Sequence, residues 1–272
     1  MINSFVEMDG IKCYAPEFAA QSEGFDIAHF EKLSKVEEIN FWFRIRNKII
    51  IQLFSKYVRI EQKIKFMEIG CGNGYVLKGL SDFKNLELTG SEIFMEGLKF
   101  ARQRLPGVEL IQMDATNMPF EKKFDVVGAF DVLEHITADE KVMQMVNRAL
   151  TDSGIFLISV PQYPWMWSAQ DDLAFHKRRY TRKELSAKLA RNGFTIEYMS
   201  SFVFTLFPVM IVSRYFKKGS KHDAMTELEI PKLLNAVFFV ILYIDYLLIQ
   251  MGISLPFGGS LICVARKNKD LI

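Results

Sequence analysis

The chain has 272 residues, 34 Lys and Arg against 32 Asp and Glu, a formal net charge of +2 and a hydrophobic fraction of 50%. This composition excludes a disordered tail and a basic nucleic-acid-binding arm, and the length suffices for a large buried core. The three cysteines, Cys13, Cys71 and Cys263, form no CxxC pair, which argues against a disulfide framework or a cysteine zinc site and for a reducing compartment.

Residues 1–60 are expected to form an N-terminal lead-in and a helical cover. Residues 1–25 are irregular, so we expect a loosely packed lead-in. They also lack the apolar segment of a signal peptide, so we expect a cytoplasmic protein. Between residues 27 and 57, apolar side chains recur at helical spacing with few breakers, which predicts one or two amphipathic helices.

Over residues 61–201, and again over 257–272, short apolar runs alternate with helical stretches. The runs that predict strands are 64–70, 86–92, 108–114, 124–130, 155–161, 194–200 and 260–267. The helical stretches lie near 75–82, 95–104, 138–150 and 182–192. Such alternation is typical of βαβ units. We therefore predict an α/β domain with a doubly wound, mostly parallel seven-stranded sheet of the Rossmann-like kind.

Local signals mark several helix boundaries. Thr137 with Glu140, and Thr181 with Glu184, have the spacing of a capping box at a helix start. Segments 152–154 and 192–193 read Asp-Ser-Gly and Asn-Gly, and we expect both to close helices before the next strand.

Residues 202–256 form a hydrophobic helical insertion before the last strand. Two apolar runs, 202–216 and 233–251, flank a polar link at 217–229. A single membrane crossing would place the last strand on the wrong side of the bilayer, and Asp245 interrupts the second run. Three alternatives stay open: a lid over the acceptor site, a homodimer interface, or a peripheral surface that dips into the lipid interface.

A glycine-rich turn follows the first predicted strand. Residues 66–74 read FMEIGCGNG, in which glycines allow close approach of a ligand and the following helix offers free N–H groups. The dinucleotide fingerprint requires Gly where this chain has Tyr75, which disfavours a nicotinamide oxidoreductase. Glu92 ends the second strand at the spacing of a ribose-hydroxyl partner. These residues indicate a nucleoside-like ligand without a diphosphate.

Four ordered motifs resemble those of class I S-adenosylmethionine-dependent methyltransferases, and they lie at 68–74, 89–92, 112–115 and 124–136. Within that superfamily the chain is most similar to the type 11 group, which also contains the ubiquinone-biosynthesis O-methyltransferases. Residues 40–47 resemble a lead-in helix of members of that group.

The resemblance implies S-adenosylmethionine as cofactor, S-adenosylhomocysteine as product and a small-molecule acceptor. It implies that the glycine turn holds the methionyl end, Glu92 the ribose hydroxyls and Asp114 the adenine amino group. Glu68 has two alternative roles that stay equally open: it supports the glycine turn, or it contacts the cofactor directly. The further cofactor-binding residues it implies are Gly70, Cys71, Gly72 and Gly74 in the turn, Ile93, Met113 and Ala115 around adenine, and Phe130 and Leu133 beside the methionine portion.

The reaction that we expect is O-methylation, with N-methylation next. Methyl transfer is an in-line displacement that needs alignment, exclusion of water and, for a hydroxyl acceptor, a base. His176 is the first candidate for that base and His135 the second. A catalytically silent scaffold of the same fold is the alternative from another class, and the intact glycine turn, Glu92 and Asp114 argue against it.

A metal-assisted variant is a further alternative that we do not favour. Asp131, Glu134, His135 and His176 resemble the set with which small-RNA terminal ribose methyltransferases hold a divalent ion, although Asp131 replaces the usual Glu.

Basic and aromatic residues near His176 leave the chemical class of the acceptor open. Residues 177–179, with Arg182 and Lys183, either face an acidic group of the acceptor or begin a solvated helix. Nucleic acid is disfavoured because the chain has no wider basic surface. Trp165 and Trp167 either wall the acceptor or pack a long loop.

Overall fold

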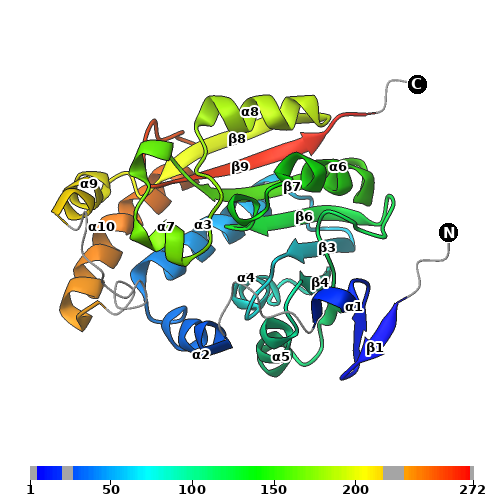
Figure 1. Cartoon of the computed structure of the whole chain (residues 1–272). Coiled ribbons are helices and arrows are strands. Elements are labelled where there is room, and N and C mark those ends of the chain that lie inside the picture. The colour runs from blue at the N-terminus through cyan, green and yellow to red at the C-terminus, as the bar shows by residue number, and fades with distance from the viewer. Residues whose placement is uncertain (1–4, 20–26, 217–229, 270–272) are drawn as a thin grey trace.

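A central sheet organises the computed structural model, which describes residues 5–19, 27–216 and 230–269 (Figure 1). In this part of the chain the sheet has nine strands, in the order β1-β2-β5-β4-β3-β6-β7-β9-β8. The seven expected strands are present as β3 (Ile64–Ile69), β4 (Leu86–Glu92), β5 (Glu109–Gln112), β6 (Phe124–Phe130), β7 (Leu150–Pro161), β8 (Phe194–Phe202) and β9 (Ser260–Lys267). Strands β3 to β7 are parallel, and β9 runs antiparallel to β7 and β8. The predicted doubly wound α/β sheet is confirmed.

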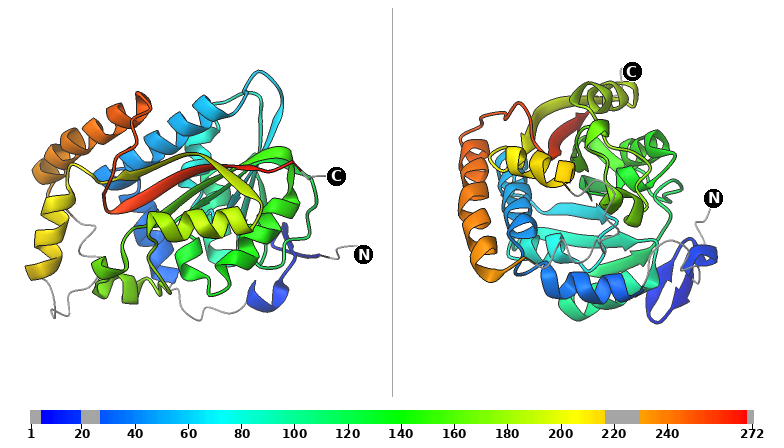
Figure 2. Two further views of the ribbon diagram at one scale, coloured as in Figure 1. Left: turned by 90° about the horizontal axis from the view of Figure 1, so that it is seen from above. Right: turned by 60° about the vertical axis from the view of Figure 1, so that its left-hand side comes forward.

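Helices cover both faces of this sheet (Figure 2). The helices that shape the two faces are α2 (Ile27–Val36), α3 (Phe41–Tyr57), α4 (Tyr75–Leu80), α5 (Met95–Arg104), α6 (Asp139–Ala149) and α8 (Arg182–Arg191). One core cluster joins the sheet to α3, α4 and α5 through side chains such as Ile49, Leu77 and Leu98. The other joins it to α6 and α8 through Val142 and Leu185. Both faces are therefore buried, as parallel sheets require.

The N-terminal lead-in differs from the expectation of loose packing. Strands β1 (Val6–Met8) and β2 (Ile11–Cys13) form a hairpin, and β2 adds to the sheet parallel to β5. Asp9 and Gly10 form its two-residue turn with φ values of 51° and 73°, the left-handed backbone that such a turn needs. A short helix, α1 (Pro16–Ala19), follows. The prediction was wrong here, while residues 1–4 and 20–26 of the lead-in lie outside the described residues.

The predicted helix boundaries agree only in part. Thr181 caps α8 by accepting a hydrogen bond from the Glu184 N–H, and α8 ends at Arg191 with Asn192 as its C-cap, as expected. The cap at Thr137 was wrong, because Ala138 is the N-cap of α6 and the Thr137 carbonyl accepts from Arg178 instead. Residues 152–154 do not close a helix either, because α6 already ends at Ala149 and β7 begins at Leu150.

Two apolar helices precede β9, as expected. They are α9 (Phe207–Phe216) and α10 (Lys232–Gln250), and the polar link expected at 217–229 lies outside the described residues. α10 packs outside α3, with Leu242, Asp245 and Ile249 buried. By length and composition alone α10 could cross a membrane. Its buried side ties it to the α/β body.

Candidate functional site

The predicted cofactor residues gather at one edge of the sheet. Strands β3 to β7 are parallel, so the segments that follow them meet at their carboxyl edge, where open α/β sheets bind ligands. Three residues at this edge, Asp131, Tyr163 and Phe175, have positive φ values of 56°, 64° and 56°. Such strained backbone in non-glycine residues concentrates at functional sites.

The glycine turn between β3 and α4 is shaped by left-handed residues. Gly70, Gly72 and Gly74 have φ values of 62°, 48° and 73°. A Cβ on Gly70 would lie 2.5 Å from a methyl carbon of Val132, whereas a Cβ on Gly72 would meet nothing within 4 Å. The turn therefore packs tightly against the segment after β6 and is open at Gly72. The Cys71 N–H donates to the Ser91 carbonyl, which ties the turn to β4.

Glu92 lies at the junction of the turn and the next two strands. Its carboxylate accepts hydrogen bonds from the N–H of Gly72 at 3.1 Å and of Ile93 at 2.8 Å. Its backbone carbonyl accepts from the Met113 N–H at 3.0 Å. Burial raises the pKa of Glu92, and its hydrogen bonds to backbone N–H groups oppose that shift. The residues predicted for the turn, ribose and adenine are thus brought together, and their cofactor roles stay predictions.

Asp114 forms a local turn at the edge of this region. Its carboxylate accepts from the N–H and hydroxyl of Thr116 at 2.8 and 2.7 Å, while Met113 and Ala115 are buried. The preceding residue, Gln112, was missed by sequence reasoning. Its buried amide binds Ala15 at both the N–H and the carbonyl, and also donates to the Ile93 carbonyl. Gln112 therefore anchors the N-terminal hairpin to the predicted adenine side.

Glu68 lies beneath the turn, where burial raises its pKa well above the usual range. One of its carboxylate oxygens has no hydrogen-bond partner in the described part of the chain. Cys71, Phe130 and Leu133 are also buried, and burial raises the pKa of the Cys71 thiol.

An ion pair that the sequence did not predict links the N-terminal cover to the site. Arg46 of α3 pairs with Asp131, directly after β6. The Ser159 hydroxyl donates to the same carboxylate at 3.1 Å. Asp131 is thereby engaged on the α3 side of the segment, and the group of possible metal ligands in the described part of the chain comprises Glu134, His135 and His176 without Asp131. The one sequence feature that pointed to Arg46 was its place within residues 40–47, which resemble a lead-in helix of members of the type 11 group.

Two histidines and an acid meet beside this segment. The rings of His135 and His176 lie edge to face, with centroids 4.7 Å apart. Nε2 of His176 is 4.0 Å from a carboxylate oxygen of Glu134. One ligand atom from each of these three residues falls within 4.8 Å of the others. Both Glu134 oxygens lack a hydrogen-bond partner among the described residues. Burial and the neighbouring His176 lower the pKa of His135 to about 4.

Asp171 fixes the orientation of His176. Its carboxylate lies 2.8 Å from Nδ1 of His176 and 2.7 Å from Nε of Arg179. Ser168 donates to the same carboxylate through its N–H and its hydroxyl in a capping box at α7 (Ala169–Leu173). The ion pairs and hydrogen bonds of this buried acid depress its pKa against the effect of burial. Sequence reasoning missed Asp171, for which the Ser168-x-x-Asp171 spacing was a usable signal.

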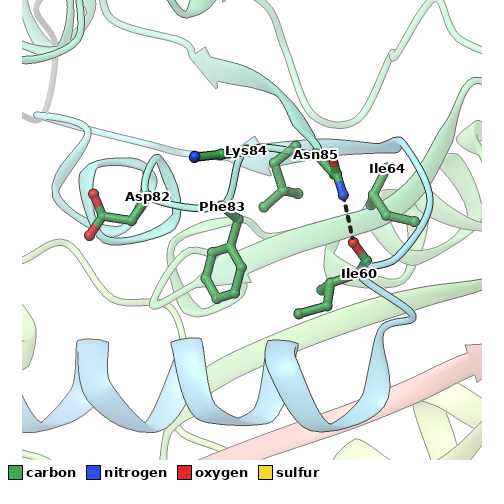
Figure 3. Close-up of a pocket in the computed structure, with 7 residues that line it drawn as sticks. Ile60, Ile64, Asp82, Phe83, Lys84 and Asn85 are labelled. Atoms are coloured by element: carbon green, nitrogen blue, oxygen red, sulfur yellow. Dashed lines mark hydrogen bonds between the residues drawn. The ribbon is translucent and has the colours of Figure 1, made fainter.

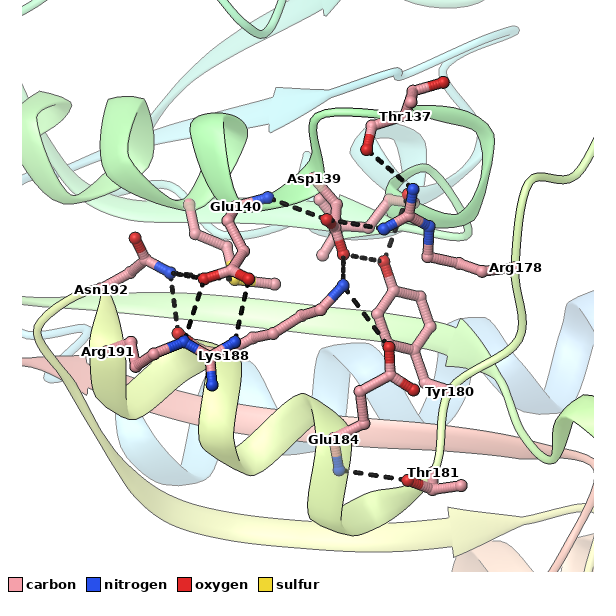
Figure 4. A network of polar contacts seen from close by, with 12 residues as sticks. Thr137, Asp139, Glu140, Arg178, Tyr180, Thr181, Glu184, Lys188, Arg191 and Asn192 are labelled. Carbon is pink, nitrogen blue, oxygen red and sulfur yellow. Dashed lines mark hydrogen bonds and ion pairs between the residues drawn. The ribbon is translucent and has the colours of Figure 1, made fainter.

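A second buried network holds the segment after His176 (Figure 4). Asp139 pairs with Arg178 and Lys188 and accepts a hydrogen bond from the Tyr180 hydroxyl at 2.7 Å. Arg178 and Arg179 are thus used within the fold, while Lys177 and Lys183 are exposed. If the acceptor carries an acidic group, the exposed side chains of this basic cluster that could bind it are Lys177 and Lys183.

The two tryptophans border the same edge. Trp165, 62% exposed, stacks on Tyr163 and contacts Phe207 of α9, and the Trp167 indole donates to Asp172 at 2.8 Å. By contrast, the pocket in Figure 3 lies beside the starts of β3 and β4, at the opposite edge of the sheet. We therefore assign no part of the cofactor site to that pocket.

A family model described as "Methyltransferase domain", of type 11, matches residues 67–158, the part that carries the glycine turn, Glu92 and Asp114. A probable S-adenosylmethionine-dependent methyltransferase of Mycolicibacterium smegmatis is 27% identical over 163 residues, which cover 59% of this chain and 62% of the relative. The match thus spans less than two thirds of that relative. The fatty-acid O-methyltransferase of the same species is 30% identical over 118 residues, 41% of this chain and 43% of the relative.

Solved structures share the fold. Phosphoethanolamine N-methyltransferase 2 of Haemonchus contortus, in complex with S-adenosyl-L-methionine, superposes with a TM-score of 0.59. The match has 16% sequence identity and covers 91% of this chain and 59% of that one.

Proposed function

The chain belongs to the class I S-adenosylmethionine-dependent methyltransferases of the type 11 group, and from this premise we propose that it methylates a hydroxyl of a small molecule. S-adenosylmethionine is the cofactor of this family, and the glycine turn with Glu92 is the site that would hold it. Bound there, S-adenosylmethionine would supply the methyl group: the oxygen–carbon bond would form as the carbon–sulfur bond breaks with its electron pair going to sulfur, and the hydroxyl proton would pass to a base of the chain.

The observation that supports a hydroxyl acceptor is the Asp171–His176 pair. A buried carboxylate at 2.8 Å from Nδ1 leaves Nε2 of His176 as the atom that accepts the acceptor's proton. His135 fits this role less well, because its pKa is lowered to about 4. In this assignment Asp171 is a positioning residue, and His176 is the base.

The acceptor proposed here is apolar, with one hydroxyl. Support comes from the relative named fatty-acid O-methyltransferase and from Leu173 and Phe175, whose apolar side chains are exposed just before His176. N-methylation is the other reaction class, and the shared fold with a phosphoethanolamine N-methyltransferase makes it the comparison to test.

The test starts with calorimetry of S-adenosylmethionine and S-adenosylhomocysteine binding. Label transfer from methyl-tritiated cofactor is then measured with an alkylphenol and with the matching alkylamine. We expect cofactor binding and preferred labelling of the phenol, with His176→Gln lowering turnover by about 10²-fold or more at unchanged cofactor affinity. No affinity for either cofactor form would favour the silent scaffold. Preferred labelling of the amine, or full turnover by His176→Gln, would refute a His-assisted O-methyltransferase.

A metal-assisted reaction is a second candidate, favoured by the Glu134 oxygens that lack partners. Glu134, His135 and His176 supply the oxygen and nitrogen donors that suit manganese or magnesium. A bound divalent ion would lower the pKa of a coordinated hydroxyl. Binding of Mn²⁺, followed by electron paramagnetic resonance in wild type and in Glu134→Gln, tests this without turnover. Equal or absent Mn²⁺ binding in both proteins would eliminate the candidate.

A further inference from the structure

The inserted helices expose an apolar surface that the described fold does not cover. α10 packs against α3 along one side, and only 17% of an apolar 18-residue stretch of this helix is buried. The other side is exposed along about five turns. Its large side chains are Leu233, Val237, Val240, Ile244, Leu247 and Met251.

Helix α9 lies between α10 and the segment that contains α7 (Figure 2). Asp245 of α10 accepts hydrogen bonds from the N–H groups of Phe204 and Thr205, which fixes the start of α9 against α10. Phe207 of α9 in turn contacts Trp165, with ring centroids 6.1 Å apart. Further large apolar side chains are exposed on α9 and in residues 165–175, namely Val209, Ile211 and Val212, and Trp165, Trp167, Leu173 and Phe175. We call the exposed side chains of α9, α10 and residues 165–175 the apolar face.

The rim of the apolar face is cationic. Lys232 is exposed at the start of α10, and Nζ of Lys56 lies 3.1 Å from the position of a Cβ on Gly252, just after its end. Lys177 is exposed beside His176. Asp245 is the sole carboxylate of α9 and α10, and it is buried. Among the described residues of the apolar face, Asp172 is the one exposed carboxylate, and the Trp167 indole donates to it at 2.8 Å, so the three lysines outnumber the exposed acids.

We propose that the apolar face docks onto the surface of a lipid bilayer with anionic headgroups. A helix that lies in the membrane interface buries one apolar side and keeps lysines at the headgroups, and exposed tryptophans favour the same depth. A second copy of the chain fits less well, because pairing two such faces would bring the lysine rims together without exposed carboxylates from α9 or α10. Because the face ends at His176, docking would present the site to a lipid-dissolved acceptor; this last step rests on the proposed function, and the docking does not.

Vesicle co-sedimentation tests the docking. We expect the full chain to bind vesicles of phosphatidylcholine and phosphatidylglycerol, and to bind phosphatidylcholine alone more weakly. Charges placed in the apolar face by Val240→Glu with Ile244→Glu should lower vesicle binding by about tenfold or more. Val6→Glu is the matched control, since Val6 is 54% exposed on β1, outside the apolar face, against 67% for Val240. All variants should bind S-adenosylmethionine as the wild type does.

The outcomes separate the alternatives. Brominated lipids should quench the fluorescence of Trp165 and Trp167, and Lys56→Glu with Lys232→Glu should remove the preference for anionic vesicles. Absence of vesicle binding by the wild type would overturn the proposal, and so would vesicle binding by the Val240→Glu, Ile244→Glu variant that equals that of the wild type. If the wild type does not bind vesicles but forms a dimer in sedimentation velocity, and the Val240→Glu, Ile244→Glu variant is a monomer, the apolar face is assigned to a second copy. Vesicle binding without cofactor affinity would uphold the docking and refute the proposed function.

Discussion

Gly70→Ala is the most direct test of how the glycine turn is built. Gly70 has a φ of 62°, and a left-handed conformation costs a residue with a Cβ about 1–2 kcal/mol. The new Cβ would lie 2.5 Å from a methyl carbon of Val132, and such overpacking costs about 1–3 kcal/mol. Together these effects should lower the free energy of unfolding by about 2–5 kcal/mol. For a domain of this size the melting temperature should fall by roughly 5–15 °C.

Two further variants separate the backbone effect from the steric one. Gly72→Ala also has a positive φ, 48°, but its Cβ would meet nothing within 4 Å, so we expect only the backbone cost of about 1–2 kcal/mol. Its Cβ projects into open space beside the Gly72 N–H, where we predict the cofactor. Gly72→Ala should therefore lower the free energy of cofactor binding by more than it lowers the free energy of unfolding. Gly70→Ala combined with Val132→Ala relieves the contact, and a double-mutant cycle should give a coupling free energy of about 1–3 kcal/mol.

The measurements are urea unfolding of the wild type and of four variants (Gly70→Ala, Gly72→Ala, Val132→Ala and Gly70→Ala with Val132→Ala), and calorimetry with S-adenosylmethionine. Two results would refute the reasoning. One is a Gly70→Ala protein as stable as the wild type, which would mean that the turn relaxes at no cost. The other is additive effects of Gly70→Ala and Val132→Ala, which would show that the two side chains do not meet.

Three other substitutions test the site and its support. Glu92→Gln should weaken S-adenosylmethionine binding by roughly 10–100-fold in calorimetry, because a charged hydrogen-bond acceptor is lost; unchanged affinity would exclude Glu92 from the ribose site. Asp139→Ala should lower the free energy of unfolding by about 3–5 kcal/mol, because Arg178 and Lys188 lose their buried partner, whereas Glu140→Ala, at an exposed pair, should have a much smaller effect. Burial raises the folded-state pKa of Glu68, so the folded state binds the extra proton and stability should decline as pH rises from the ordinary carboxyl pKa towards that raised value. Glu68→Gln should flatten this decline in urea titrations at several pH values and the exposed Glu61→Gln should not; a decline that persists in Glu68→Gln would assign it to another group.

Much of the fold could be predicted from residue spacing alone. The helix expected at 95–104 and the strand expected at 124–130 have those bounds in the structure, because apolar periodicity and breakers agree there. The N-terminal hairpin was missed because strands of three residues are too short to show a period. Its signal was the Asp9-Gly10 pair, which favours a two-residue hairpin turn wherever apolar and polar residues alternate around it.

The positions of the candidate site residues could be predicted where these residues end or follow a strand, and less so where side chains pair across the fold; the ligand contacts of these residues stay predictions. Glu92 ends β4 and Asp114 follows β5, and the alternating pattern sets the place of both strands in the sheet. Arg46 and Asp131 are 85 residues apart, so their pairing depends on how α3 packs over the sheet. Asp171 is only five residues from His176, yet the bond between them needs the turn after α7, in which Phe175 has a positive φ and the His176 N–H donates to the Asp171 carbonyl.

α10 shows why hydropathy alone left three alternatives open for the insertion. Leu242, Asp245 and Ile249 lie on the side that packs against α3, while Val240 and Ile244 lie on the exposed side. Both sides are apolar, so an average over the sequence cannot tell the packed side from the free one. Asp245 looked like an interruption of an apolar run, but it binds the backbone N–H groups that lead into α9. The one acidic residue of α10 therefore serves packing, and the apolar side that faces away from α3 is the side for which we propose docking to a lipid surface.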